Sequence, residues 1–198
     1  MKALLLIDIQ NDFLPGGALA VPEGDLIVPI VNGLMPEFEM VVATQDWHPA
    51  DHGSFASNQQ GAAVFGQGEL EGLPQTFWPV HCVQHTGGAL FAPGLETRRI
   101  GRVFPKGMNP RIDSYSGFFD NGHRASTGMG QWLKAAGVTD LWVAGLATDY
   151  CVKFTVLDAL MEGFAVTVLR EACRGVELTE GDGVRAWEEM AAAGAVVV

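Results

Sequence analysis

One of the three cysteines occupies a position that favours nucleophilic chemistry. In residues 141–158 an apolar run ends at Gly145, a turn of small residues follows, and Cys151 falls at the start of a segment with helical periodicity. Backbone N–H groups and the positive end of a helix dipole stabilise a thiolate there, so we expect the pKa of this thiol to lie below its free value of about 8.5. The same turn supplies backbone donors for a developing oxyanion. The alternative interpretation is a buried cysteine with a packing role.

Two charged residues are chemically suitable partners for this thiol. Asp8 lies within the first apolar run, and a buried carboxylate needs a partner. Lys106 follows another apolar run, and its positive charge would favour the thiolate and keep Asp8 ionised if the three side chains meet. Asp8 would then take the thiol proton and later activate water. Alternatively, Lys106 is a solvated surface residue, as most lysines are.

A set of carboxylate and imidazole groups predicts a metal site. Asp46, His48 and His52 lie within seven residues in the segment D-W-H-P-A-D-H, directly after an apolar run, and a third imidazole comes from His81 or His85. Such mixed ligands suit Zn, Fe, Mn or Co, and a site with open positions for water is catalytic in character. The spacing matches no regular zinc motif, so hydrogen-bonded histidines in a polar loop are the alternative.

Three aromatic residues lie in polar or glycine-rich segments, outside the apolar runs: Phe13, Trp78 and Tyr115. Most aromatic side chains belong to a core, but aromatic residues of loops often form the walls of a site for a flat ligand. We therefore consider both a core role and a ligand-binding role for them.

The elements that must position these residues alternate along the chain. Short apolar runs predict strands over residues 3–9, 40–44, 99–104, 140–144, 165–169 and 195–198. Helical spacing appears over residues 26–37, 130–136, 151–162 and 181–193, and the last three segments are each followed by a glycine. Strands buried on both faces and separated by helices predict a three-layer αβα sandwich, Rossmann-like, with a mostly parallel central sheet of about six strands.

Such a sheet explains how distant residues would meet. Ligands bind beyond the carboxyl ends of parallel strands, so the polar residues that follow each apolar run should converge there. These residues are Asp8 and Asp12 after the first run, Asp46 and His48 after the second, Lys106 after the third, and Asp149 and Cys151 after the fourth. We expect residues 1–198 to form a single domain, with a long irregular excursion at about 46–91 that binds metal and substrate, because long loops within compact domains are usually functional.

Composition limits the class of partner. The net charge of −11 disfavours nucleic acid or an anionic membrane surface, since both would repel the chain. No apolar window approaches the roughly 20 residues of a membrane span. Three cysteines are an odd number in a chain too long to need disulfide bonds, which indicates reduced thiols and a cytoplasmic location. A small molecule is therefore the expected partner, and the protein is expected to be a monomer or homodimer.

Several longer motifs carry a specific resemblance. They are L-I-D-I-Q-N-D-F at 6–13, T-Q-D-W-H-P-A-D-H-G-S-F-A-S at 44–57, G-L-P-Q-T-F-W-P-V-H-C-V-Q at 72–84, D-S-Y-S-G-F-F-D at 113–120 and G-L-A-T-D-Y-C-V-K-F-T-V-L-D-A-L at 145–160, with K-G at 106. In this order and spacing, the chain closely resembles the nicotinamidase (pyrazinamidase) family of the isochorismatase-like cysteine hydrolase superfamily. The resemblance spans nearly the whole chain.

The resemblance implies roles for the residues that match. It implies a catalytic triad of Asp8, Lys106 and Cys151, and a metal held by Asp46, His48, His52 and His81, with His85 outside the motif. The oxyanion donors would be the backbone N–H groups of Ala147 and Cys151, after a non-proline cis peptide at Leu146–Ala147. The ring of the substrate would be enclosed by Phe13, Trp78 and Tyr115. Tyr150 corresponds to a variable family position and receives no catalytic role.

The implied activity is hydrolysis of nicotinamide to nicotinate and ammonia through a thioester, with pyrazinamide as an analogue, in NAD salvage. The implied cofactor is one divalent ion, Zn, Fe or Mn, with Zn preferred. Enzymatic alternatives are an isochorismatase-like hydrolase or an N-carbamoyl amidase on the same fold, although the D-W-H-P-A-D-H segment argues against both. A metal-binding protein without turnover and a thiol redox protein are alternatives from other classes, and the redox role lacks a C-x-x-C motif.

Overall fold

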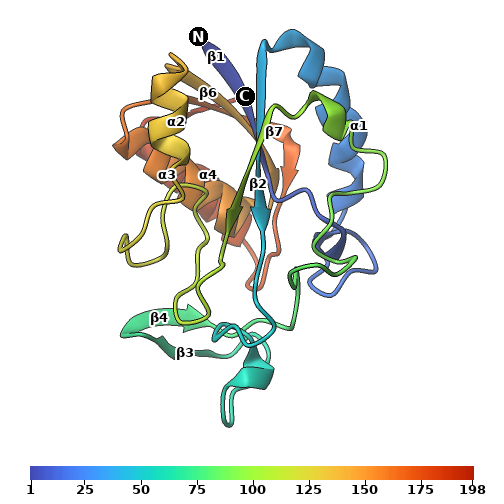
Figure 1. Ribbon diagram of the computed structural model, residues 1–198, viewed down its shortest axis with the longest axis vertical. Coiled ribbons are helices and arrows are strands. Elements are labelled where there is room, and N and C mark those ends of the chain that lie inside the picture. The colour runs from blue at the N-terminus through green and yellow to red at the C-terminus, as the bar shows by residue number, and fades with distance from the viewer.

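A parallel six-stranded sheet forms the centre of the computed structural model, which describes residues 1–198 (Figure 1). The strand order is β5-β2-β1-β6-β7-β8, and every neighbouring pair is parallel. The strands span Lys2–Ile7 (β1), Met40–Asp46 (β2), Arg102–Lys106 (β5), Asp140–Leu146 (β6), Ala165–Arg174 (β7) and Val196–Val197 (β8). Strands β2 and β5 lie on one side of β1, and the later strands β6, β7 and β8 lie on its other side. The order therefore reverses between β1 and β6, the kind of place where open α/β sheets bind ligands.

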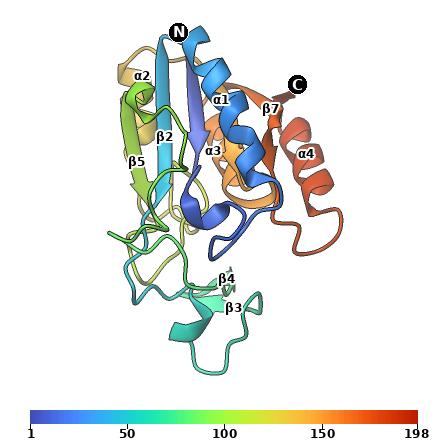
Figure 2. The ribbon, with the colours of Figure 1, turned by 90° about the vertical axis from the view of Figure 1, so that its right-hand side faces the viewer.

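Helices cover both faces of the sheet. Helix α1 (Ile27–Leu34) packs on one face, and α2 (Met129–Ala135), α3 (Lys153–Met161) and α4 (Asp182–Ala192) pack on the other. Figure 2 looks onto the α1 face, with β5 and β2 on one side of this helix and β7 on the other. The arrangement confirms the predicted three-layer sandwich. No helix is both long enough and apolar enough to cross a membrane.

The alternation of side chains along β1 shows why its sequence is apolar throughout. Leu5 and Ile7 belong to the hydrophobic cluster beneath α2, α3 and α4, whereas Leu4 and Leu6 belong to the cluster beneath α1. All four side chains are buried. A strand covered on both sides has no polar face, which is why its hydrophobic residues form a continuous run.

The predicted elements are present, with shifted ends. The run predicted from residue 99 becomes a strand only at Arg102, because residues 97–99 form a 3-10 turn. The helix predicted over 26–37 ends at Leu34 and continues as a 3-10 turn containing Pro36, which lacks the N–H needed to extend an α-helix. Cys151 lies in a π-helical turn, Thr148–Val152, and α3 begins directly after it.

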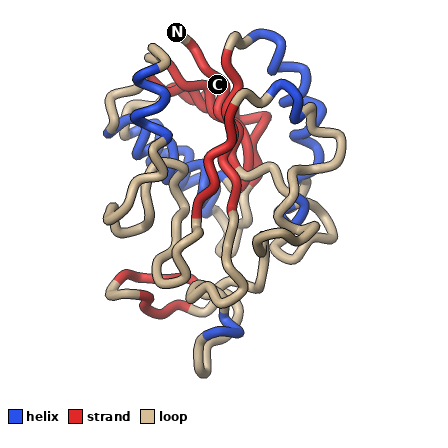
Figure 3. The backbone as a smooth tube through the Cα atoms, viewed as in Figure 1, coloured by secondary structure: helices blue, strands red, loops and turns tan.

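A small antiparallel hairpin within the excursion was not anticipated by the sequence analysis. Strands β3 (Gln67–Leu70) and β4 (Leu73–Thr76) are joined by Glu71 and Gly72, both with positive φ, as a two-residue hairpin turn requires. The hairpin lies beyond the carboxyl ends of the central strands, among the loops that dominate this end of the molecule (Figure 3). Its strands have only four residues each, too few to produce a clear periodic signal.

The end of β6 approaches β1 closely at one glycine. Gly145 pairs with Ile7 and has φ +138°, and a Cβ added there would lie 2.2 Å from the Ile7 carbonyl oxygen. The peptide bond between the next two residues, Leu146–Ala147, is cis, in agreement with the resemblance noted above.

We expect Gly145→Ala to destabilise the protein by roughly 3 kcal/mol or more, because strain at positive φ is combined with a clash against backbone. Gly137→Ala is the matched control. Gly137 also has positive φ (+78°), but an added Cβ would meet no atom within 4 Å, so only the conformational cost of about 1 kcal/mol applies. Urea unfolding measures both losses, and equal losses would show that the close approach to Ile7 has no energetic effect.

Candidate active site

Four of the seven polar residues predicted to converge meet at the carboxyl edge of the sheet, and His48 lies beside one of them, Asp46. Asp149 instead accepts hydrogen bonds from the Val176 and Glu177 N–H groups, and Asp12 accepts one from the Cys82 N–H. Asp8 follows β1, Asp46 and Lys106 are the paired last residues of β2 and β5, and Cys151 follows β6. All four side chains are buried. The parallel register delivers them to one place, although they lie far apart in the sequence.

Lys106 is the centre of this group. Its Nζ lies 2.9 Å from Asp8 Oδ2, 2.5 Å from Asp46 Oδ1 and 3.4 Å from Cys151 Sγ. It also donates a hydrogen bond of 2.9 Å to the Ser114 carbonyl. The ammonium group thus contacts two carboxylates and the thiol in a region closed to solvent.

The charges of this group shift one another's pKa values. Burial alone would lower the pKa of Lys106, but Asp46 and Asp8 hold it well above its usual range, so it stays charged. Burial would raise the pKa of Asp46, yet Lys106 and His48 hold it well below its usual range. The pKa of Asp8 is raised by burial, and Lys106 opposes this only in part. Asp8 is therefore the carboxyl group of the pair that takes up a proton more readily.

The predicted low pKa of Cys151 is wrong. Burial raises the pKa of this thiol well above its usual value, and the opposing charge of Lys106 does not compensate. The neighbouring carboxyl group of Asp8 raises the pKa of the thiol further, because it favours the protonated form. Desolvation of the anion outweighs the helix dipole here. Cys151 is consequently a thiol at neutral pH, and a nucleophilic role would require removal of its proton.

Next to this group, three of the four predicted metal ligands come together. Asp46 Oδ2 lies 3.3 Å from His48 Nε2 and 3.5 Å from His81 Nε2. Ligand atoms bound at about 2.1 Å to a shared ion lie roughly 3.0–3.4 Å apart, close to these separations. His85, the alternative to His81, is exposed and packs edge-on against Trp47, away from the cluster.

The hydrogen bonds of the histidines fit a metal. Nδ1 of His48 lies 2.9 Å from the Gly107 carbonyl, and Nδ1 of His81 lies 2.8 Å from the Pro79 carbonyl. A carbonyl only accepts, so each Nδ1 carries the proton and leaves the lone pair of Nε2 directed at Asp46. The donor set of one carboxylate and two imidazoles suits a divalent ion.

His52 is placed differently from the other three. It groups with His48 and Asp113 rather than with Asp46 and His81. Its Nδ1 contacts Ser54 Oγ at 2.7 Å, while its buried Nε2 has no hydrogen-bond partner in the chain. A fully buried nitrogen without a partner is costly, which points to a group outside the chain at this position.

The three predicted aromatic residues line one small pocket with the thiol. Phe13, Trp78 and Tyr115 form walls of a pocket that also reaches Cys151 and Ala147. Its remaining lining residues include Asp46, His48 and His81. The nucleophile, the aromatic walls and the candidate metal cluster therefore face the same enclosed space.

Three residues of the site were missed by sequence reasoning. Gln10 fixes the backbone of Asp46, because its side chain accepts from the Asp46 N–H and donates to the Asp46 carbonyl, both at 2.8 Å. Asp113 is buried, lines the pocket and accepts a hydrogen bond from Gln75. Tyr150 lines the pocket from the position before Cys151. Each lies within a quoted motif, which was the only signal available for them.

Comparisons with known proteins agree with this geometry. The family model described as Isochorismatase domain matches residues 2–198. A nicotinamidase of Escherichia coli is 55% identical over 99% of this chain and 93% of its own length. The structure of an Acinetobacter baumanii nicotinamidase and pyrazinamidase is 43% identical, with a TM-score of 0.96 over 100% of this chain and 95% of that one. The pyrazinamidase of Pyrococcus horikoshii in complex with zinc is 39% identical, with a TM-score of 0.81 over 100% of this chain and 98% of that one.

We expect Lys106→Met to destabilise the protein by about 3–5 kcal/mol, because it leaves Asp8 and Asp46 buried without a cation. The control is Lys134→Met, which removes an ion pair with Glu162 from a half-exposed lysine and should cost less than about 1 kcal/mol. Urea unfolding of the two variants gives the comparison. Similar losses in both would mean that the buried ammonium does not hold the site together.

Proposed function

The chain belongs to the isochorismatase family, and from this premise we propose that it hydrolyses nicotinamide to nicotinate and ammonia, with Cys151 as the nucleophile and a divalent metal ion beside it. The observation that carries the proposal is the contact of Lys106 with Asp8, Asp46 and Cys151 next to an imidazole cluster. Pyrazinamide, which has a similar flat ring and carboxamide, is accepted as an analogue. Hydrolysis of nicotinamide serves NAD salvage.

The excursion over residues 46–91 supplies most of the binding groups. Asp46, His48 and His81 are the direct metal ligands, and His52 is the fourth member of the set, with its unpartnered Nε2 available. Zn is the preferred ion, with Fe and Mn as the other candidates, and the zinc complex of the Pyrococcus horikoshii relative supports this preference. When bound, the ion supplies a positive charge that orients the pyridine ring.

The aromatic walls hold the substrate for attack. Phe13, Trp78 and Tyr115 enclose the ring, so that the carboxamide lies over Cys151. Asp8 takes the proton of the thiol as sulfur forms a bond to the carbonyl carbon. The backbone N–H groups of Ala147 and Cys151 hold the oxyanion that results.

Collapse of this intermediate breaks the C–N bond. Asp8 returns its proton to the leaving nitrogen, and ammonia departs, leaving a thioester on Cys151. Asp8 then removes a proton from water, and the hydroxide attacks the thioester carbon. Nicotinate leaves and the proton returns to the sulfur. Lys106 keeps its charge throughout, because its pKa is held high, and it stabilises the sulfur whenever this carries negative charge.

We further propose a cytoplasmic location and a monomeric or homodimeric state. All three cysteines are free thiols, which suits a reducing compartment. Nicotinamide is small and neutral, so the net charge of −11 does not hinder its binding.

We expect Cys151→Ala to reduce ammonia release from nicotinamide by at least about 1,000-fold, since no other thiol lines the pocket. Metal content should stay unchanged, because sulfur is not part of the Asp46, His48 and His81 group. Cys173→Ala, which removes a buried thiol of the hydrophobic core, is the control and should retain turnover. Retained turnover in the Cys151 variant would rule the mechanism out.

We expect His81→Gln to weaken metal binding by at least about 100-fold, because it removes a ligand atom from the cluster. His85→Gln is the matched control, since His85 is exposed and outside the cluster. Chelator competition followed by metal analysis measures the affinity, and ammonia release is measured on the same samples. Metal binding without ammonia release in the unaltered protein would instead indicate a metal-binding protein without turnover.

A further inference from the structure

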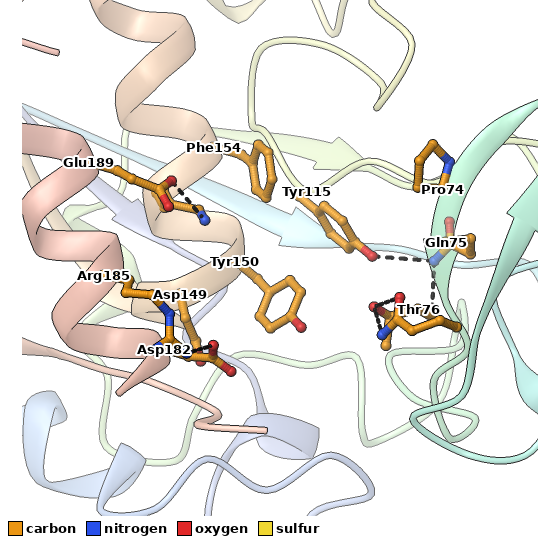
Figure 4. Close-up of a pocket in the computed structure, with 12 residues that line it drawn as sticks. Pro74, Gln75, Thr76, Tyr115, Asp149, Tyr150, Phe154, Asp182, Arg185 and Glu189 are labelled. Atoms are coloured by element: carbon orange, nitrogen blue, oxygen red, sulfur yellow. Dashed lines mark hydrogen bonds and ion pairs between the residues drawn. The ribbon is translucent and has the colours of Figure 1, made fainter. Parts of the chain in front are cut away.

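Two cavities meet at a pair of tyrosines. The inner pocket, with Cys151, has a volume of about 20 Å³. An outer cleft of about 300 Å³ lies between the β3–β4 hairpin and the first turns of α3 and α4 (Figure 4). Tyr115 and Tyr150 are the two residues that line both spaces. They therefore form the partition between the nucleophile and the outer cleft.

The inner pocket has to open before a ring can enter. A volume of about 20 Å³ has room for about one water molecule, far less than a pyridine carboxamide. Phe13, Trp78 and Cys151 are buried parts of its wall. The two tyrosines are only half-buried and face the outer cleft. Entry is therefore expected through the partition.

Tyr150 is the less restrained member of the pair. The Tyr115 hydroxyl accepts hydrogen bonds of 3.3 Å from both Gln75 Nε2 and Trp78 Nε1. The Tyr150 ring projects into the cleft toward the hairpin, and no comparable hydrogen bond holds its hydroxyl (Figure 4). Its ring rests edge-on against Trp78 and Tyr115, with centroids 4.8 and 5.4 Å away. Rotation of Tyr150 would thus join the two spaces at little cost in hydrogen bonds.

We propose that Tyr150 is a specificity-determining residue that restricts the enzyme to primary carboxamides; this inference rests on the proposed amide hydrolysis. Tyr150 and Cys151 both line the inner pocket, so a carboxamide held over the thiol would lie beside the Tyr150 ring. A substituent on this nitrogen would collide with the closed Tyr150 ring. Without this ring, the substituent extends into the outer cleft.

The outer cleft is suited to a polar substituent. Its walls include Gln75 and Thr76 from the hairpin, Lys153 from α3, and Asp182 and Arg185 from α4. The reaction itself is unchanged for a secondary amide. Sulfur bonds to the carbonyl carbon, the C–N bond breaks, and the leaving amine takes the proton held by Asp8.

The test compares nicotinamide with N-(2-hydroxyethyl)nicotinamide as substrates for the full-length metal-loaded enzyme. We expect Tyr150→Ala to raise kcat/KM for the substituted amide relative to nicotinamide by at least about 10-fold, a change typical of a few heavy atoms removed from a pocket. Tyr150→Phe should keep the unaltered ratio, because the ring remains. Phe154→Ala should also keep it, because Phe154 lines the outer cleft and not the inner pocket.

A purely structural role for Tyr150 would lower the rates for both amides together and leave their ratio unchanged. A ratio within about twofold of the unaltered enzyme in Tyr150→Ala would therefore overturn the proposal. Tyr150→Leu, which keeps apolar contact with Trp78, replaces the alanine variant if the latter does not fold, with the same ratio as readout. Failure of the unaltered enzyme to release ammonia from nicotinamide would contradict the proposed function itself.

Discussion

The buried ammonium group of Lys106 is the interaction on which the rest of the site depends. It lies between the carboxylates of Asp8 and Asp46. The three residues lie at the ends of three different strands, β1, β2 and β5. Two carboxylates buried side by side would otherwise repel each other, and one of them would take up a proton. A one-residue slip of any of these strands would turn its side chain to the opposite face and leave a buried charge without a partner. The charge cluster and the register of the sheet are thus mutually dependent.

Asp46 connects the two halves of the site. Its Oδ1 contacts Lys106, and its Oδ2 contacts Nε2 of His48 and His81. Two carboxylates share one ammonium ion, so a net negative charge remains near the imidazoles, and a divalent cation there would neutralise it. The side chain of Gln10 holds Asp46 in place, because it hydrogen-bonds to both the backbone N–H and the backbone carbonyl of Asp46. Asp46 therefore belongs both to the buried charge cluster around Lys106 and to the candidate metal site.

Exclusion of water from the inner pocket determines the protonation state of Cys151. Because burial raises the pKa of Cys151, this side chain is a thiol before substrate binds, and the proposed mechanism assigns removal of its proton to Asp8. A buried thiol is also protected from solvent and oxidants until the pocket opens. The same enclosure makes the partition at Tyr150 important, because whatever opens it controls both access and the size of the leaving group. Reactivity and selectivity share one cause, the closure of the inner pocket.

The sequence by itself determined the layered α/β fold and the convergence of Asp8, Asp46, Lys106 and Cys151, because apolar runs are local signals and parallel strands end at one edge of a sheet. It did not determine everything around them. Spacing left both His81 and His85 open, and the family motif favoured His81. The tertiary structure places His81 against Asp46, from a segment distant in sequence, and His85 against Trp47. The β3–β4 hairpin, the high pKa of Cys151 and the partition at Tyr150 were likewise decided by the folded molecule. These features arise from desolvation and from contacts between segments far apart in the chain, which local periodicity does not encode.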